Sequence, residues 1–228
     1  GNDAHDNLLG IKHVVANMPH IYSGIQLKDI IELNKGKNKT AIIASTGPSL
    51  NKQIELLRKV APHALILIPD ASYHVLKING IKPDFVTTME RVEKTSEFFQ
   101  SEPSQFDDNI IFIAASLTHP QTSKNLQNRN RCYAHRPIRF EFILKDEVPF
   151  MCKGPSSAHF ALDMALNLKC ERIIFIGQDL AFAKDGSSHA KGNIFENYIK
   201  EDGTITINPN ARQRPQTAIA YGGEGEVK

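Results

Sequence analysis

The sequence contains no tryptophan, only three cysteines and no excess of charge of either sign. Lys and Arg number 27 and Asp and Glu 25, and a formal net charge of +2 argues against nucleic-acid or membrane-surface binding. The cysteines, Cys132, Cys152 and Cys170, are odd in number and form no Cys-x-x-Cys motif. This pattern excludes a disulfide framework and a zinc ribbon, and it favours reduced thiols in the cytoplasm.

Long apolar runs are also lacking. No run approaches the ~20 residues that cross a bilayer, so no membrane span is predicted. Residues 1–6 are polar and lack the apolar centre of a secretory signal. The nine histidines show no metal-ligand spacing, so no metal site is predicted. With 41% hydrophobic residues in a chain of 228, a sizeable core can form.

Short apolar segments alternate with amphipathic ones from residue 40 to residue 176. The segments typical of buried strands are 40–44, 64–68, 85–89, 110–115, 131–135 and 172–176. The segments typical of helices are 51–60, 72–78, 93–100, 121–128 and 156–168. The alternation predicts an α/β fold, Rossmann-like and doubly wound, with a mostly parallel sheet. Such sheets bind ligands at the carboxyl ends of their strands, where the strand order reverses.

Three regions follow from composition and pattern. Residues 1–37 form an N-terminal helical segment, in which Pro19 is expected to kink or end the helix. Residues 38–182 form the predicted Rossmann-like nucleotide-binding core. Residues 183–228 are rich in Gly, Ser, Asn and Asp, and we expect loops there, in a piece of a longer protein.

The loop after the first predicted strand reads Ser45, Thr46, Gly47, Pro48 and Ser49. Glycine permits a close approach to backbone, and a serine at the next helix start can cap that helix. The first N–H groups of a helix form a phosphate site, so this loop is predicted to bind the phosphate of a nucleotide. The alternative is an ordinary turn between a strand and a helix.

Charged residues follow the second and third predicted strands. Asp70 is expected to hold a ribose hydroxyl or a base, or to cap the following helix. Glu90 and Arg91 are predicted to face the same cleft, with Arg91 in contact with the nucleotide, or to form a surface ion pair. His119, after the fourth strand, is either an acid–base group or, with better support, a residue that starts a helix.

A second Gly-Pro-Ser loop precedes the helix at 156–168. Gly154, Ser156 and Ser157 in it are predicted to bind an anionic group at the helix start, or only to cap the helix. After the last strand, Gln178 and Asp179 are predicted at the same edge, and His189 on the next loop could pair with Asp179 as a general base. The alternative is a loop histidine with no role.

Together these segments resemble a known family. The matching segments are ASTGPSL (44–50), PDAS (69–72), NGIKPDFVTTMER (79–91), THP (118–120), KGPSSAHFALDMALNL (153–168) and IIFIGQDLAF (173–182), with His189. Over about 38–190 the chain resembles the DUF115 family of motility accessory factors, which are flagellin glycosyltransferase-like proteins. That family also includes archaeal proteins similar to 6-hydroxymethyl-dihydropterin diphosphokinase (MptE-like).

The resemblance implies a Rossmann-like core related to the sialyltransferases that use CMP-sugars. It implies transfer of a pseudaminic, legionaminic or sialic type sugar onto Ser or Thr of flagellin in the cytoplasm. Gly47, Pro48 and Ser49 would then lie at the nucleotide phosphate. The related sialyltransferases carry Asn beside this loop, where this chain has Ser45 and Thr46, and the full motility factors are much longer.

The same resemblance assigns the rest of the site. Asp70 would face the ribose or the base, and the donor pocket would be lined by Glu90, Gln178 and Asp179. His189 would be the base, and Asp179 and Glu90 would also be catalytic. No cofactor is required in this hypothesis.

Two other hypotheses remain open. A pterin diphosphokinase would need ATP and Mg²⁺, the metal being held by carboxylates such as Asp70, Glu90 or Asp179. The third hypothesis is a binding module that recognises flagellin or a nucleotide-sugar without turnover.

Overall fold

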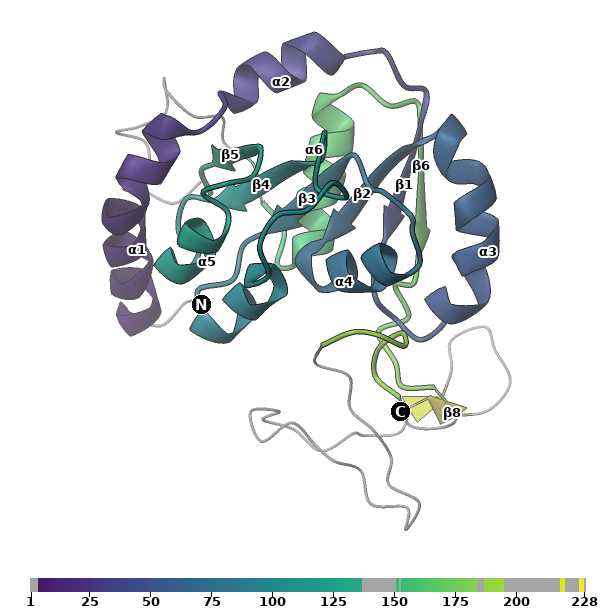
Figure 1. Cartoon of the computed structure of the whole chain (residues 1–228). Helices are drawn as coiled ribbons and strands as arrows, with labels where there is room; N and C mark the ends of the chain where they lie inside the picture. The colour runs from purple at the N-terminus through teal and green to yellow at the C-terminus, as the bar shows by residue number, and fades with distance from the viewer. Residues whose placement is uncertain are drawn as a thin grey trace.

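The computed structural model describes residues 4–136, 151, 153–183, 187–194, 218–219 and 226–227. Its core is a parallel sheet of six strands in the order β5-β4-β3-β2-β1-β6 (Figure 1). The strands are β1 (Thr40–Ala44), β2 (Leu65–Pro69), β3 (Phe85–Thr88), β4 (Ile111–Ala115), β5 (Arg131–Ala134) and β6 (Arg172–Ile176). The predicted α/β fold with a parallel sheet is therefore confirmed, and each strand lies within two residues of its predicted range.

Helices cover both faces of the sheet, with α4 in front of it and α6 behind it in Figure 1. The helices are α1 (Ala4–Ser23), α2 (Leu27–Asn34), α3 (Leu50–Val60), η1 (Ala61–His63), α4 (Asp70–Ile78), η2 (Glu93–Phe99), α5 (Pro120–Asn125) and α6 (Ser157–Asn167). Successive β1 residues point to opposite faces, so Ile43 packs in the cluster with α6 and Ile42 in the cluster with α3 and α4. The interior strands are mostly apolar because both of their faces are buried, and their polar residues are Thr40 of β1 and Thr87 and Thr88 of β3.

Pro19 does not end its helix, so that alternative of the prediction was wrong. Helix α1 continues through Pro19 to Ser23, and the break falls at residues 24–26. Before the proline, the Asn17 side-chain amide donates to the carbonyls of Ser116 at 2.9 Å and Thr118 at 2.8 Å. These tertiary contacts outweigh the backbone hydrogen bond that a proline removes. The segment at 93–100 also differs, since η2 is a 3₁₀ helix.

The N-terminal helices pack against the sheet. Val14 of α1 and Leu27 and Ile30 of α2 belong to the same apolar cluster as Ile43 of β1. Of the predicted loop-rich segment 183–228, residues 184–186, 195–217, 220–225 and 228 lie outside the described residues, as does Cys152. Its described part includes β7 (Ala218–Ile219) and β8 (Glu226–Val227), which pair in antiparallel fashion.

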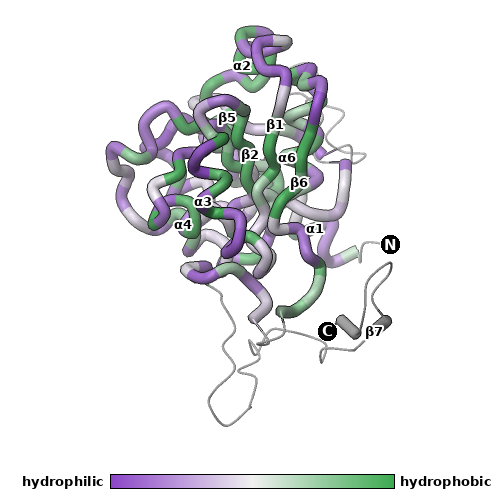
Figure 2. Tube along the Cα trace, turned by 90° about the vertical axis from the view of Figure 1, so that its right-hand side faces the viewer, coloured by the Kyte–Doolittle hydropathy of each residue, from purple (hydrophilic) through white to green (hydrophobic). Residues whose placement is uncertain are grey.

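Strand β6 is an apolar strand at one edge of the six-stranded sheet. Ile174 is 46% exposed and Phe175 44% exposed, whereas the central strands are buried. Figure 2 looks onto this side of the molecule, where most of β6 is hydrophobic. Such an edge has unpaired backbone groups that a further strand can join.

Within the described part of the chain, no helix is both long enough and apolar enough to span a membrane.

Candidate functional site

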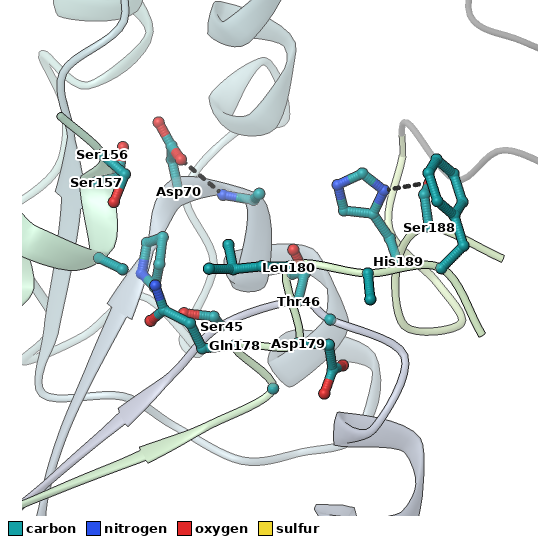
Figure 3. A pocket seen from close by; sticks show the side chains of 17 residues that line it. Ser45, Thr46, Asp70, Ser156, Ser157, Gln178, Asp179, Leu180, Ser188 and His189 are labelled. Atoms are coloured by element: carbon teal, nitrogen blue, oxygen red, sulfur yellow. Dashed lines mark hydrogen bonds between the residues drawn. The ribbon is translucent and has the colours of Figure 1, made fainter. Parts of the chain in front are cut away.

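The strand order reverses between β1 and β6. From β1 the chain winds outward to β5, and α6 then returns it across the opposite face to β6 beside β1. Doubly wound sheets bind ligands in the crevice that this reversal leaves at the carboxyl ends of the strands. A cavity of about 390 Å³ opens there, between the loops after β1, β2 and β6 and the start of α6 (Figure 3). Its size is within the range of small-molecule sites.

The cavity brings together many of the predicted site residues, from four separate parts of the chain. Those that line it are Ser45, Thr46, Gly47, Asp70, Ser156, Ser157, Gln178, Asp179 and His189. Those that do not line it are Pro48, Ser49, Glu90, Arg91 and Gly154. The roles assigned to these residues from the sequence stay predictions, whereas their positions and contacts are set by the fold.

The loops after β1 and β6 cross in direct contact. The Ser45 N–H donates to the Ile176 carbonyl at 2.9 Å, and the Gly47 N–H donates to the Gly177 carbonyl at 2.6 Å. A Cβ atom on Gly47 would lie under 3.0 Å from the Gly177 carbonyl oxygen and the Asp179 carboxylate. Glycine is therefore needed here for the approach of another segment of the chain itself.

The start of α3 is occupied by a carboxylate. The Ser49 N–H donates to Oδ2 of Asp179 at 2.8 Å, and Ser49 forms no side-chain cap. The prediction that Ser49 caps this helix was wrong, because Asp179 supplies the charged acceptor that favours a helix N-terminus. A phosphate bound at this point would have to displace the Asp179 carboxylate.

The start of α6 faces the cavity through Ser156, Ser157 and Ala158. The prediction of a serine cap was wrong here too, since the Ser156 hydroxyl is hydrogen-bonded to Nδ1 of His159 at 2.7 Å. The first N–H groups of a helix have no acceptor within that helix. Of the two Gly-Pro-Ser loops, the second thus offers the better place for an anion.

Two buried polar atoms at the cavity lack partners. Within the described residues, no hydrogen-bond partner is found for the Ser45 hydroxyl or for the side-chain oxygen of Gln178. Both residues line the cavity. Buried polar atoms in proteins are nearly always hydrogen-bonded, and a polar group bound in the cavity would satisfy both.

Asp70 is the buried carboxylate of the site. Its Oδ1 accepts from the Ala71 N–H at 2.9 Å and its Oδ2 accepts from the Thr88 hydroxyl at 2.7 Å. Burial raises the pKa of Asp70 to about 6, the two hydrogen bonds oppose that rise, and the nearby Glu90 charge adds to it. A carboxyl group that titrates this close to neutrality in a cavity is typical of a functional site.

This raised pKa predicts that Asp70 weakens the fold at neutral pH. A carboxyl whose pKa is higher in the folded state than in the unfolded state stabilises the fold when protonated, and that stability is lost between about pH 4 and pH 6. The free energy of unfolding of Asp70→Asn should therefore equal that of the wild type near pH 4 and exceed it by about 2–3 kcal/mol above pH 7. Urea unfolding at both pH values measures the gap, and the exposed Asp108→Asn is the control. A gap that shrinks as pH rises would contradict the prediction.

His189 lines the cavity from a segment that is held by hydrogen bonds to the loops after β1 and β2. The Ala190 N–H donates to the Thr46 carbonyl at 2.7 Å, and the Asn193 side-chain amide donates to the Ala71 carbonyl at 3.0 Å. Nδ1 of His189 is hydrogen-bonded to the Ser188 hydroxyl at 2.8 Å (Figure 3). The anchors Ala190 and Asn193 were missed in the sequence because neither has a chemical signature.

Glu90 and Arg91 lie outside the cavity. The Arg91 guanidinium forms an ion pair with Asp6 at 2.6 Å and so holds α1. Glu90 is exposed, and its backbone carbonyl accepts from the His119 N–H at 3.0 Å. His119 itself accepts from the Gln121 N–H at 3.2 Å at the start of α5, which confirms the helix-start interpretation.

The fold and the place of the cavity define a doubly wound α/β protein with a pocket where its strand order reverses. Residues 12–185 match the family described as 6-hydroxymethylpterin diphosphokinase MptE-like. The chain belongs to this family, and the resemblance found in the sequence is confirmed at that level. Among the described residues, no group of three or more His, Cys, Asp or Glu side chains could hold a metal ion.

One similar solved structure is that of the MAf glycosyltransferase from Magnetospirillum magneticum AMB-1. It superposes with a TM-score of 0.54 at 21% identity, over 64% of this chain and 24% of that chain. The likeness shows a shared fold, and this chain spans about a quarter of that longer one. No curated protein matches the sequence.

Proposed function

We propose that this chain is a glycosyltransferase-like domain that binds a CMP-linked nonulosonic acid of the pseudaminic, legionaminic or sialic type. In the cytoplasm it would support transfer of that sugar to Ser or Thr of flagellin, in flagellar glycosylation and motility. The observation that carries the proposal is the pair of unpartnered polar atoms of Ser45 and Gln178 beside the Asp70 carboxylate in one cavity. A donor rich in hydroxyl and amino groups would satisfy all three.

The charge of the cavity favours a donor with a single phosphate. Its described lining carries two carboxylates, Asp70 and Asp179, and no Lys or Arg. A phosphate several ångströms from a carboxylate is repelled, and the repulsion grows with each added charge. A CMP-linked nonulosonic acid carries one negative charge on its phosphate and one on its sugar carboxylate, whereas ATP has three phosphates and would need a cation to enter.

Each part of the donor has a place in this proposal. Asp70 accepts hydrogen bonds from the ribose or the base, and the first turn of α6 meets the phosphate. His189 takes the proton of the acceptor hydroxyl, whose oxygen attacks the anomeric carbon as the bond to CMP breaks. The charge that develops on the departing CMP is met by backbone N–H groups, so no cofactor is required.

A pterin diphosphokinase is the second candidate, because the matching family is described by that activity. In that case Mg²⁺ would arrive with ATP, and Asp70 and Asp179 would be its protein ligands. A module that binds a nucleotide-sugar or flagellin without turnover is the third.

Calorimetric titration with CMP, and separately with ATP, each with and without Mg²⁺, tests these alternatives. We expect CMP to bind without Mg²⁺, and Asp70→Asn to weaken CMP by about 10- to 150-fold, because a hydrogen bond to a charged group is lost. Asp108→Asn removes the charge of an exposed carboxylate outside the cavity and should leave CMP affinity unchanged.

Other results would redirect the proposal. ATP binding that depends on Mg²⁺ and on Asp70 would favour the diphosphokinase. Binding of neither nucleotide by the folded protein would overturn the nucleotide site and favour a module for a protein partner. CMP binding that survives Asp70→Asn would show that Asp70 is not a ligand of the nucleotide.

A further inference from the structure

Strand β3 ends in two buried threonines, Thr87 and Thr88, at 0% and 1% exposure. Successive side chains of a strand point to opposite faces of the sheet, so the two hydroxyls serve different elements. Thr87 donates to the Ser157 carbonyl at the start of α6, at 2.9 Å. Thr88 donates to Oδ2 of Asp70 at the start of α4, at 2.7 Å. Neither threonine lines the cavity, yet each contacts a residue that does.

The hydrogen bond from Thr88 holds the Asp70 carboxylate in one orientation. A hydroxyl has one proton to donate, and that of Thr88 is used on the carboxylate. The other carboxylate oxygen is held by the Ala71 N–H, so both oxygens of this 5% exposed residue have protein donors. An O–H···O⁻ bond favours the ionised carboxylate, and burial opposes it.

We propose that Thr88 is a positioning residue of the pocket: its buried hydroxyl holds the Asp70 carboxylate in the orientation and the ionised form in which it accepts hydrogen bonds from a ligand. The inference rests on the proposed function for the identity of the ligand as a nucleotide. The charged group that acts on Asp70 from beside β3 is Glu90, and Asp179 and His189 line the same cavity.

Three variants separate positioning from a general effect on the fold. Thr88→Val keeps the shape of the side chain and removes the hydroxyl, whereas Thr88→Ser keeps the hydroxyl. Thr87→Val makes the same change one residue earlier, at an equally buried site whose hydroxyl contacts Ser157 instead. Circular dichroism establishes that each variant is folded.

The first measurement is the titration of the Asp70 carboxyl by carbon-13 NMR without ligand. With Thr88→Val we expect the midpoint to rise by about one pH unit from the wild-type value near 6, because a donor to the charged form is lost. With Thr88→Ser and with Thr87→Val it should stay within a few tenths of the wild type. A midpoint that does not move in Thr88→Val, or that moves equally in Thr87→Val, overturns the proposal.

The second measurement is CMP affinity as a function of pH. Near pH 7 we expect Thr88→Val to weaken CMP by about tenfold. About twofold of this loss comes from protonation of Asp70 and should recover as pH rises past the new midpoint, whereas the loss due to orientation should remain. Thr88→Ser should restore affinity to within about threefold of the wild type. If the Asp70 midpoint moves but the wild type does not bind CMP, the proposed function fails while the link between Thr88 and Asp70 stands.

Discussion

Arg129→Met should lower the free energy of unfolding by about 3–5 kcal/mol, because it breaks a buried ion pair. The Arg129 side chain is 0% exposed and lies 3.4 Å from Asp107. Its guanidinium donates to the carbonyls of Asn125 and Ser101, each at 2.7 Å, and lies 5.6 Å from the centre of the Phe112 ring. The Arg129 side chain thus contacts α5, β4 and the segment after η2. Methionine cannot form these hydrogen bonds. Urea unfolding measures the loss.

Asp107 explains why the loss should be large. Burial alone would raise the pKa of Asp107, but the hydrogen bonds from Tyr73 and Ser104 and the charges of Arg129 and Lys77 hold it below its usual range. Without Arg129, a 4% exposed carboxylate loses a main partner. The double variant Asp107→Asn, Arg129→Met should therefore lose less free energy of unfolding than the sum of the losses of the two single variants.

The exposed Arg58→Met is the matched control for this network. Arg58 pairs with Glu55 in an exposed i, i+3 contact on α3. Exposed pairs contribute little to stability. A loss for Arg129→Met no larger than that for Arg58→Met would show that the buried network does not stabilise the fold.

The strands could be predicted because a parallel sheet buries both of its faces. Segments such as AIIA (41–44) and IIFIAA (110–115) are apolar throughout, and only a buried strand or a buried helix has that composition. Helix α1 does not end at Pro19, because local propensity is weaker than the tertiary contacts of Asn17. No local pattern records an amide that binds carbonyls about 100 residues away.

The candidate site could be located in part for a similar reason. Asp70 and Gln178 come within two residues of the ends of β2 and β6, and both line the cavity. Glu90 lies two residues beyond β3, where the chain has already turned outward to solvent. Thr88 could not be predicted, because a threonine in a strand is ordinary for its β propensity. The contact of Asp179 with Ser49 spans 130 residues and was likewise invisible.

Gly177→Ala should have the largest effect at the site itself. Gly177 has a φ of +64°, and a Cβ there would lie under 3.0 Å from the backbone carbonyl of Ser45. Left-handed backbone costs alanine about 1–2 kcal/mol, and the collision with backbone adds about 1–3 kcal/mol. The β1 and β6 loops would have to separate, which moves Gln178 away from the cavity. We expect lower stability in urea and loss of CMP binding together.

Gly80→Ala separates the two causes. Gly80 has nearly the same φ, +65°, but a Cβ there would meet nothing within 4 Å. It should therefore show only the cost of left-handed backbone, with CMP affinity unchanged, because Gly80 follows α4 away from the cavity. If both variants lower the free energy of unfolding equally, the β1 and β6 loops can accommodate a Cβ atom at Gly177 without further cost. The close contact at Gly177 would then not be what shapes the pocket.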